Sequence, residues 1–576
     1  MIPAPRRSTL PRAPVAALLL LLAGCATAPP PAAPPPVPPV APASPASSAT
    51  RTAALLAIND VYRIEGVERG TVGGMSRFRT LRAELERQHP ELLVLHAGDA
   101  LFPSLLSRTF NGEQMIDVLN AMDGAPDAFD GRMFAVFGNH EFDKDTLEDA
   151  PLLDGHVEES QFRWVNGNVE FVAGTDGQPV IAGENLARTW LVGSGGIRVG
   201  IFGLTVDSKR PEYAARFLDP VETARELTAV LRDQGAEVVV ALTHLNARDD
   251  RRLLRTLGAD GPDVVIGGHD HESMACEVEG RLVLKSDADA RTARLVELTL
   301  DAGGRLTVAH ELHPLEAPLG EDCETQGKVD SWLALHEGLF CGQDAVRNKT
   351  RLDPRCLERE LGTTQVALEA EENKIRGRET NLGDWVADRM VEAFAACGAQ
   401  AAFVNSGSLR LNQDVAPGPI TRRTVEELFA YPAPLYLLRI DGRTLEAVAR
   451  QAIAGWPGSG NWLQISGFAF VHDTAGRDVS GVELTTLSGR RPVRPDEEIL
   501  VVTNDYLIDP TMGNQDGFTM LNEGMVVQEC AANGKDLKND IVVAALAAAG
   551  GIAPRAEGRI RQVPAATEVD PCADIP

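Results

Sequence analysis

The chain has 576 residues, of which 55 are basic and 82 acidic, giving a formal net charge of −27 at pH 7. This charge argues against DNA, RNA or an anionic membrane surface as the main partner, because each would be repelled. An anionic small-molecule substrate would need local cations to hold it. The apolar fraction of 44% and the charged fraction of 24% are typical of globular proteins. The length is too great for one hydrophobic core, so we expect two or more domains.

The N-terminal residues have the features of a targeting signal. Arg6, Arg7 and Arg12 precede the apolar run VAALLLLLAGC, which is too short to span a bilayer. Its last four residues, LAGC, resemble a bacterial lipobox. This resemblance implies that residues 1–25 are a lipoprotein signal peptide, with cleavage before Cys25 and acylation of its thiol. An ordinary signal peptide and a spanning helix are the alternatives. The resemblance places the protein in a bacterial cell envelope, facing the periplasm or the surface, and Ala26 after the cysteine suits an outer membrane.

Residues 26–50 are rich in Pro, Ala and Ser and are predicted to form an extended tether. Seven cysteines follow Cys25, and none forms a CxxC pair, which disfavours a zinc ribbon. Outside the cytoplasm some of them can pair as disulfides. Cys323, Cys341 and Cys356 are candidates, and the odd number predicts at least one free thiol.

From residue 51 to about 310, short apolar runs alternate with helix-like segments, which predicts an α/β layered fold. In such folds the functional residues follow the carboxyl ends of the strands. Five of the apolar runs end in residue types that bind metals. These residues are Asp60, Asp99, Asn139 with His140, His244, and His269 with His271.

The residue types in this set suit two divalent transition-metal ions, since they combine carboxylates, an amide oxygen and imidazoles. An aspartate can bridge two ions, and a two-metal site of this kind fits phosphoester hydrolysis. The sequence therefore predicts a dinuclear centre with ions of the Mn, Zn, Co or Mg class.

The order of these motifs, with GNHEFD at 138–143 and GGMSRF at 73–78, resembles the calcineurin-like metallophosphoesterases and, among them, the 5′-nucleotidase family. The similarity covers residues 53 to about 562. It implies a four-layer α/β/β/α metallophosphoesterase sandwich over 51–315 and an interdomain connection over 316–360. A mixed α+β substrate-binding domain over 361–565 and a tail over 566–576 would follow.

The resemblance also implies a role for each matching position. Asp99 matches the bridging ligand. Asn139, His244 and His269 match the remaining ligands of one ion, and Asp60 and His271 match ligands of the other. His140 matches the residue that stabilises the transition state or protonates the leaving group, with Asp143 orienting its imidazole.

Tyr62 departs from the family pattern, in which a histidine stands two residues after the first aspartate. Three interpretations compete. Tyr62 can be a phenolate ligand, which would favour a harder ion such as ferric iron. It can line the site, leaving that ion to Asp60, Asp99 and His271, which is the interpretation favoured here. In the third interpretation, half of the two-metal site has been lost. A packing role just past the strand is the alternative outside the site.

In the second half of the chain, the resemblance implies a set of substrate-binding positions. Arg376, Asn405 and Arg410 would contact base or phosphates, with Arg378 as a further candidate. Asp516 would bind ribose hydroxyls, and Tyr431 and Tyr506 would clamp the base.

We expect a lipid-anchored, two-metal phosphohydrolase that removes the 5′-phosphate from nucleotides. A 2′,3′-cyclic-nucleotide phosphodiesterase and a UDP-sugar diphosphatase are near alternatives, and a hydrolase of sulfur compounds is a distant one. The alternative that is not an enzyme is a non-catalytic nucleotide-binding lipoprotein. The oligomeric state is left open.

Overall fold

The computed structural model describes residues 50–473, 478–513 and 517–563, together with Cys572. The predicted signal peptide with Cys25, nearly all of the tether, and Asp516 lie outside the described residues. Residues 48–576 form one compact unit. Within the described part of the chain, every helix is too short or too polar to cross a lipid bilayer.

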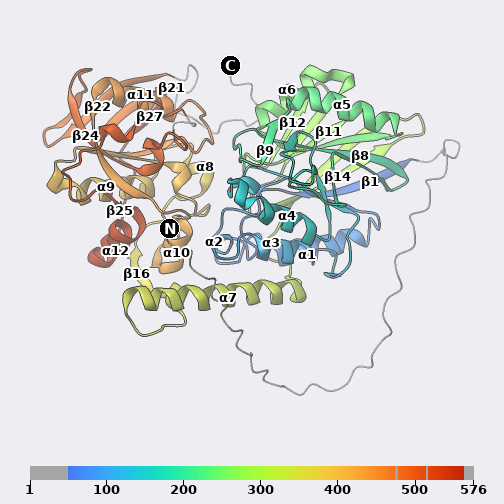
Figure 1. Ribbon diagram of the computed structural model, residues 1–576, viewed down its shortest axis with the longest axis horizontal. Coiled ribbons are helices and arrows are strands. Elements are labelled where there is room, and N and C mark those ends of the chain that lie inside the picture. Colours follow the sequence, from blue (N-terminus) through green and yellow to red (C-terminus); the bar gives the residue numbers. More distant parts are fainter. Residues whose placement is uncertain (1–49, 474–477, 514–516, 564–571, 573–576) are drawn as a thin grey trace, which may run out of the picture. The chain divides into compact units, whose positions relative to one another are not determined.

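Two β-sheets form the centre of the N-terminal domain (Figure 1). The first has the order β15 (Leu306–Pro314), β14 (Thr292–Leu300), β1 (Arg51–Ile58), β2 (Leu93–His96), β3 (Met133–Val136), β4 (Arg163–Val165), β6 (Leu186–Ala187). The second has the order β12 (Met274–Val278), β13 (Arg281–Lys285), β11 (Val264–Gly267), β10 (Val238–His244), β8 (Ile197–Thr205), β7 (Thr189–Ser194). From β1 to β6 in the first sheet, and from β13 to β8 in the second, neighbouring strands run parallel.

Apolar side chains from both sheets fill the layer between them. Leu55 of β1, Ile201 of β8 and Val240 of β10 belong to one buried cluster. The next residue of β1, Leu56, belongs to a different cluster on the opposite face of the sheet. Because both faces of β1 are buried, its sequence is a continuous apolar run without alternation.

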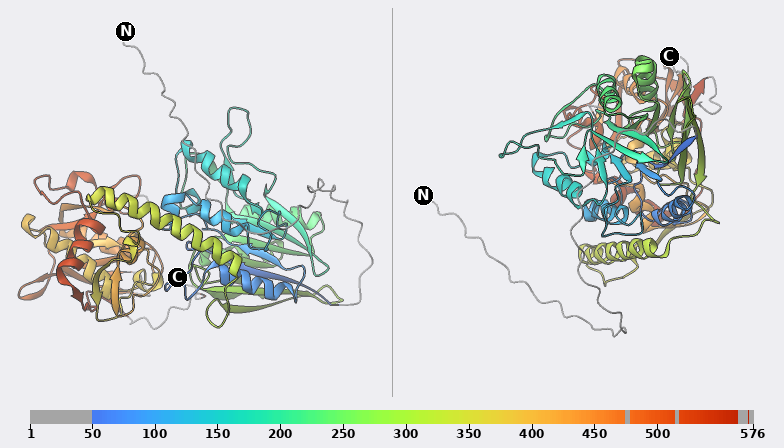
Figure 2. Two further views of the ribbon diagram at one scale, coloured as in Figure 1. Left: turned by 90° about the horizontal axis from the view of Figure 1, so that it is seen from below. Right: turned by 90° about the vertical axis from the view of Figure 1, so that its right-hand side faces the viewer.

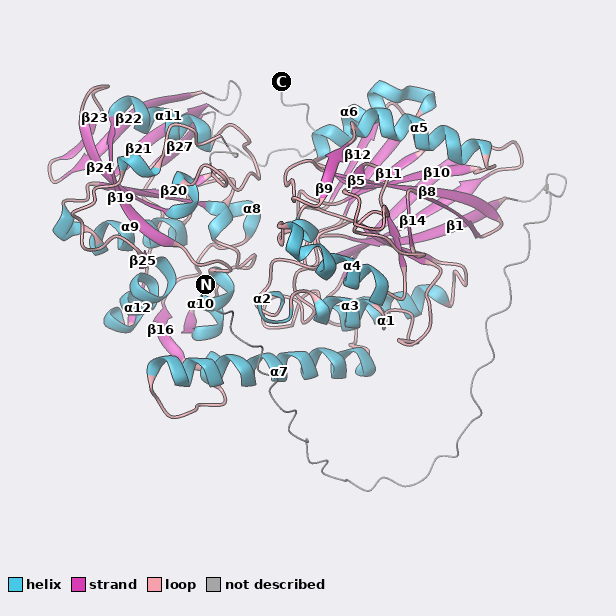
Figure 3. Ribbon diagram, in the orientation of Figure 1, coloured by secondary structure: helices cyan, strands magenta, loops and turns pink. Residues whose placement is uncertain are grey.

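Helices cover the outer face of each sheet (Figure 3). One set packs with the first sheet: α1 (Met75–Glu86), α3 (Glu113–Leu119) and α4 (Ala150–Glu159). The other packs with the second sheet: α5 (Pro220–Asp233) and α6 (Ala247–Leu257). Shorter elements are α2 (Ser107–Phe110) and the pair β5 (Val169–Phe171) and β9 (Ala214–Phe217). This arrangement confirms the predicted α/β/β/α sandwich.

A 26-residue helix, α7 (Cys323–Asn348), lies in the segment predicted as the connection (Figure 2). The Asp322 carboxylate caps it by accepting a hydrogen bond from the Thr325 amide at 2.9 Å. Val329 is buried against the N-terminal core, while Leu335 and Leu339 are exposed. The helix lacks a continuous apolar face along its length, which is the signal by which a long surface helix is found in a sequence.

The C-terminal domain combines three sheets with helices and confirms the predicted mixed α+β class. The largest sheet has the order β20 (Leu463–Ser466), β17 (Ala401–Asn405), β24 (Glu498–Asn504), β19 (Pro434–Asp441), β25 (Lys535–Asp536). The second has β23 (Gly489–Pro492), β22 (Val479–Thr486), β21 (Phe468–Asp473), β27 (Ile560–Val563), and the third β18 (Gly418–Thr421), β16 (Glu360–Thr364), β26 (Gly551–Ile552). The helices are α8 (Glu372–Ile375), α9 (Asn381–Ala393), α10 (Arg422–Leu428), α11 (Gly442–Ala452) and α12 (Ala544–Ala549).

Three disulfides join distant parts of the described chain. The pairs are Cys276–Cys572, Cys341–Cys356 and Cys397–Cys530. Among the described cysteines Cys323, at the start of α7, is free and exposed. This outcome agrees with the expectation of at least one free thiol. It also gives the pairing that the sequence left open, in which Cys341 and Cys356 bond to each other.

Candidate metal centre

The predicted metal ligands meet where the two sheets end. Asp60, Asp99 and Asn139 follow β1, β2 and β3 of the first sheet. His244 closes β10, and His269 and His271 follow β11 of the second sheet. Because the strands of each set are parallel, their carboxyl ends share one edge. The structure thus brings all five predicted strand ends to one place.

Two groups of ligand atoms form there, each with its atoms within 4.8 Å of one another. One comprises Asp99, His244 and His269, and the other Asp60, Asp99 and His271. Asp99 belongs to both groups. A carboxylate shared in this way is the arrangement that the resemblance implied for the bridging ligand.

The backbone of these residues is strained. Asp60, Asp99, His269 and His271 have φ values of 52°, 57°, 81° and 63°. A non-glycine residue in this left-handed region costs on the order of 1–3 kcal/mol and persists only where its surroundings hold it. The Asp60 amide, for example, donates to the Gly98 carbonyl at 2.9 Å. Strain concentrated on the ligand residues favours a functional site over an ordinary turn.

The glycines of the motifs are required by close packing around the ligands. A Cβ atom on Gly138 would lie 2.1 Å from Asp99 Oδ1, and one on Gly268 would lie 2.3 Å from the Ala97 carbonyl oxygen. Both distances are too short for any side chain. The glycines in GNH and GGH therefore let neighbouring strand ends approach one another.

Glu141 holds two of the ligand loops together, a role that the sequence analysis missed. Its buried carboxylate accepts hydrogen bonds from the amides of Asp99 at 3.0 Å, Ala100 at 2.6 Å and Leu101 at 3.0 Å. It also accepts one from the Gly138 amide. The carboxylate thus joins the loop after β2 to the loop after β3. Its position inside GNHEFD was the available signal.

The ligand histidines are oriented by their second ring nitrogen. His244 Nδ1 donates to the Ala97 carbonyl at 2.7 Å, which leaves Nε2 at 3.2 Å from Asp99 Oδ2. His271 Nδ1 bonds to the Glu372 carboxylate of α8, which leaves Nε2 at 3.3 Å from Asp60 Oδ1. Such partners fix the tautomer of metal-binding histidines. Glu372 was not predicted, because it lies 101 residues away in the sequence.

The electrostatics of the cluster favour cations. Burial alone would lower the pKa of His244, yet the Asp99 and Asp60 carboxylates raise it to about 9. Burial would raise the pKa of Asp60, but His271 and His244 lower it to about 2. The carboxylates thus stay ionised and hold positive charge beside them.

The residues present fit two divalent ions. Asn139 Oδ1 is buried and has no hydrogen-bond partner among the described residues. An orphaned amide oxygen of this kind is costly unless a cation or a water satisfies it. The group of Asp99, His244 and His269 offers one carboxylate and two imidazoles, and the resemblance assigns the Asn139 oxygen to the same ion. This mixture of carboxylate, amide and imidazole donors is one that divalent ions such as Mn²⁺ and Zn²⁺ accept.

Tyr62 lies inside the second group and not merely beside it. Its buried hydroxyl is 2.9 Å from His271 Nε2, 3.1 Å from Asp99 Oδ2 and 3.3 Å from Asp60 Oδ1. Burial, together with the two carboxylates, raises the pKa of the Tyr62 phenol well above its usual value. Tyr62 is thus placed where it can either line the site or bind an ion.

His140 and Asp143 form a pair next to the ligand groups. His140 Nδ1 donates to Asp143 Oδ1 at 2.9 Å, and its backbone amide donates to Asp99 Oδ1 at 2.7 Å. Asp143 also binds Lys209 and accepts a hydrogen bond from the Tyr431 hydroxyl at 2.8 Å. Burial lowers the pKa of His140 well below its ordinary value. A lowered pKa favours the neutral imidazole, and with Nδ1–H directed at Asp143 the Nε2 lone pair faces Arg410.

The predicted substrate residues separate into two sets. Arg410 Nη1 lies 3.4 Å from His140 Nε2, and Arg376 pairs with Glu372. Arg378 instead pairs with Glu369 at 2.8 Å, with half of its side chain exposed. Arg378 thus lies apart from the arginines that reach the metal centre.

The polar and aromatic candidates of this domain have different surroundings. Asn405 Oδ1 accepts from Ser408 at 2.7 Å and Asn504 at 3.0 Å. Tyr506 packs half-buried against an apolar cluster of its own domain. Tyr431 is 41% exposed and reaches Asp143 through its hydroxyl. Its ring is therefore available for stacking. The predicted ribose ligand, Asp516, lies outside the described residues.

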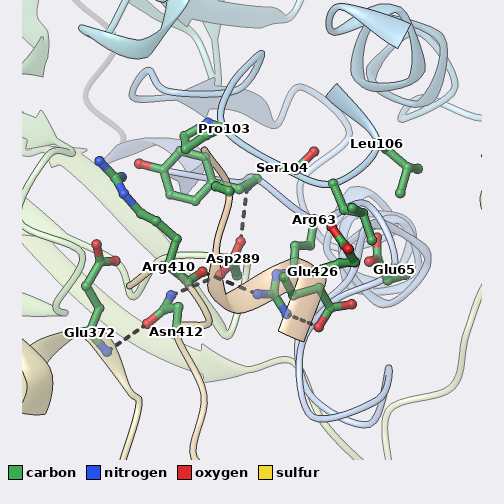
Figure 4. Close-up of a pocket in the computed structure, with 14 residues that line it drawn as sticks. Arg63, Glu65, Pro103, Ser104, Leu106, Asp289, Glu372, Arg410, Asn412 and Glu426 are labelled. Carbon is green, nitrogen blue, oxygen red and sulfur yellow. Dashed lines mark hydrogen bonds and ion pairs between the residues drawn. The ribbon is translucent and has the colours of Figure 1, made fainter. Parts of the chain in front are cut away.

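A pocket beside the metal centre is lined by both domains (Figure 4). Asp289 joins them: it accepts from the Tyr62 amide at 3.1 Å and from Asn412 Nδ2 at 2.9 Å. Arg63 donates to the Leu411 carbonyl close by. Asp289 was not predicted, although its φ of 56° marks it as another strained residue.

Comparison with known proteins agrees with this geometry. Residues 54–273 match the family model of the calcineurin-like phosphoesterases. The protein is accordingly a metal-dependent phosphoester hydrolase. Residues 360–523 match the model of the 5′-nucleotidase C-terminal domain. With both domains present, the chain belongs to the 5′-nucleotidase family, as its motifs predicted.

Individual relatives are distant in sequence. The trifunctional nucleotide phosphoesterase YfkN of Bacillus subtilis (strain 168) is 25% identical to this chain. The aligned region covers 85% of this chain but only 34% of YfkN. A snake venom 5′-nucleotidase of Gloydius brevicauda is 25% identical over 74% of this chain and 75% of its own. A 5′-nucleotidase precursor structure from Thermus thermophilus has a TM-score of 0.71 at 24% identity, covering 89% of this chain and 99% of that one. This last likeness shows the same two-domain fold.

Replacing Glu141 by Ala should weaken metal binding and stability together, because four backbone amides lose a charged acceptor. Hydrogen bonds to charged groups contribute roughly 1.5–3 kcal/mol each, so we expect a loss of at least about 3 kcal/mol in the free energy of unfolding. Urea unfolding and metal analysis measure the two effects. Glu84→Ala, at an exposed position on α1, is the control. Unchanged metal content and stability in Glu141→Ala would contradict the role assigned to this carboxylate.

Proposed function

We propose that the chain is a 5′-nucleotidase, which hydrolyses the phosphate ester of nucleoside 5′-monophosphates to nucleoside and inorganic phosphate. The single observation that carries the proposal is the meeting of two domains at the metal centre. Arg410 of the nucleotidase-type domain lies 3.4 Å from His140 of the phosphoesterase domain. A phosphoryl group bound there would contact a guanidinium and an imidazole at once.

Two divalent ions would be held by Asp60, Asp99, His244, His269 and His271, together with Asn139, whose buried oxygen has no partner among the described residues. Ions at such sites neutralise charge on the phosphoryl oxygens and activate a water nucleophile. The chain's own residues orient the substrate. Arg410 can form a two-pronged contact with phosphoryl oxygens, which a lysine cannot.

His140 is suited to move a proton to the leaving group. Asp143 fixes its Nδ1–H, so that Nε2 faces the Arg410 guanidinium. A phosphate dianion beside Nε2 favours the protonated ring, because an opposite charge raises the pKa of histidine. When the P–O5′ bond breaks, the Nε2 proton passes to the ribose oxygen and leaves it as a neutral hydroxyl.

The nucleoside part would lie against the C-terminal domain. Tyr431 offers an exposed ring beside the His140–Asp143 pair, and stacking of a base on such a ring tolerates different bases. Tyr506 and Asn405 come from the ends of β24 and β17, which are neighbours in the largest sheet. These residues make nucleotides a better fit than small sulfur compounds, which carry no ring to stack.

We further propose that the protein is anchored in the cell envelope through lipid on Cys25. The basic stretch, the short apolar run and the LAGC sequence support this location. Three disulfides support it as well, because such bonds persist in oxidising compartments.

A substrate screen tests the activity. Protein loaded with Mn²⁺, Zn²⁺ or Co²⁺ should release phosphate from AMP and other 5′-monophosphates. Faster turnover of 2′,3′-cyclic nucleotides or UDP-sugars would move the assignment to a diesterase or a diphosphatase. No turnover of any of them by metal-loaded protein would favour a binding protein.

In the same assay, His140→Ala should lower kcat by about 10²–10⁴, the usual contribution of a general acid or base. Its metal content should stay at the wild-type value, because His140 belongs to neither ligand group. His89→Ala, in the turn that follows α1, is the matched control and should keep both properties. A His140→Ala protein that retains wild-type kcat would remove this residue from the chemistry.

Labelling cells with radioactive palmitate tests the anchor. The wild-type chain should take up label and sediment with membranes, whereas Cys25→Ser should do neither. Equal labelling of the two would contradict lipidation at Cys25.

A further inference from the structure

The environment of the Tyr62 hydroxyl is that of a metal ligand. Three ligand atoms surround it: His271 Nε2 at 2.9 Å, Asp99 Oδ2 at 3.1 Å and Asp60 Oδ1 at 3.3 Å. Neighbouring oxygen ligands in an octahedron with bonds of about 2.1 Å are separated by about 3 Å, so these distances fit a single coordination sphere. All four residues belong to the N-terminal domain.

The Tyr62 hydroxyl cannot donate to both carboxylates at once. A phenol has one proton, so it can donate to one acceptor at a time. Here two carboxylate oxygens and one imidazole nitrogen converge on the same hydroxyl, and the site is buried. Carboxylates that face one another without enough protons are costly in a buried site. A cation shared by the four atoms satisfies all of them together.

The backbone and the ring of Tyr62 are held in place. Its amide donates to Asp289 Oδ1 at 3.1 Å, and its ring lies 5.4 Å from the His271 ring and 5.9 Å from the His140 ring. With both the main chain and the ring fixed, the hydroxyl points at the ligand atoms. A residue that merely lined the pocket would not need this convergence.

We propose that Tyr62 is a phenolate ligand of the ion held by Asp60, Asp99 and His271. The proposal deepens the proposed function and rests on it for the presence of two ions. It assigns to Tyr62 the position that a histidine holds in the family motif.

The proposal makes the two ligand groups chemically unequal. With Tyr62, one group has three anionic oxygens and one imidazole. The other has Asp99 and two imidazoles, to which the resemblance adds the neutral Asn139 oxygen. Anionic oxygen donors favour a harder, more highly charged ion, and imidazoles favour divalent ions such as Zn²⁺. Tyrosinate is an established ligand of iron in proteins. The Tyr62 site thus selects Fe³⁺, and the His244–His269 site selects a divalent ion.

The test measures metal binding without using substrate. The mature chain is stripped of metal, reloaded with iron and zinc, and analysed for metal content and visible absorption. Wild-type protein should bind one iron and one zinc and show the visible charge-transfer band of an Fe³⁺–phenolate. Tyr62→Phe should lose the band and bind the iron more weakly, by more than the roughly 10–100-fold that loss of an outer partner of a ligand costs.

Two further variants complete the test. Tyr62→His should bind two divalent ions and show no charge-transfer band. This variant keeps the proposal testable if the Tyr62→Phe protein fails to fold. Tyr213→Phe is the matched control: it removes a buried hydroxyl that donates to the Lys144 carbonyl at 2.7 Å, and it should behave as wild type.

A band that survives in Tyr62→Phe, or iron binding that is equally tight with and without the hydroxyl, would overturn the assignment. The result is independent of catalysis. Iron bound through Tyr62 in a protein that hydrolyses no nucleotide would leave this inference standing and remove the proposed function.

Discussion

The site depends on one carboxylate, Asp99, that belongs to two groups of ligand atoms. One of its oxygens accepts the His140 amide at 2.7 Å, and the other lies 3.2 Å from His244 Nε2 and 3.1 Å from the Tyr62 hydroxyl. These contacts join loops from both sheets. The left-handed backbone of Asp99, the closeness of Gly138 and the amides gathered by Glu141 all follow from placing this side chain at the meeting point. The free energy of that local strain is offset by the packed sandwich beneath it.

The positions of the strand ends could be predicted from the sequence, because buried parallel strands are continuous apolar runs and their ligands follow directly. That pattern was sufficient to single out the six candidate ligands and His140, whereas Asp143 was assigned through the family resemblance. The residues that orient them could not be found in this way. Glu372 reaches His271 from another domain, and Asp289 reaches Tyr62 from a loop 227 residues away. Contacts of this kind leave no periodic signal.

Other differences have local causes. The segment 316–360 was assigned as an interdomain connection from the family resemblance, and α7 within it lacks the continuous apolar stripe that would have marked it as a long helix. The sequence shows the spacing of Tyr62 from Asp60 but not the direction of its hydroxyl, so it could not reveal the contacts of that hydroxyl with Asp99 and His271. From the sequence, Tyr431 was expected only to stack on the base. In the structure its hydroxyl also donates a hydrogen bond to Asp143. An amphipathic side chain can serve both purposes, and the sequence reveals only the ring.

The most direct test of this account is the number of metal ions per chain in wild-type protein and in Asp99→Asn, measured by elemental analysis after dialysis. A shared carboxylate predicts two ions in wild-type protein and weakened binding of both in the variant, because each site loses the same anionic oxygen. Asp260→Asn, at an exposed position, should retain both ions. If Asp99→Asn loses only one ion, or if the wild-type protein binds fewer than two, the account of a centre built around Asp99 is wrong.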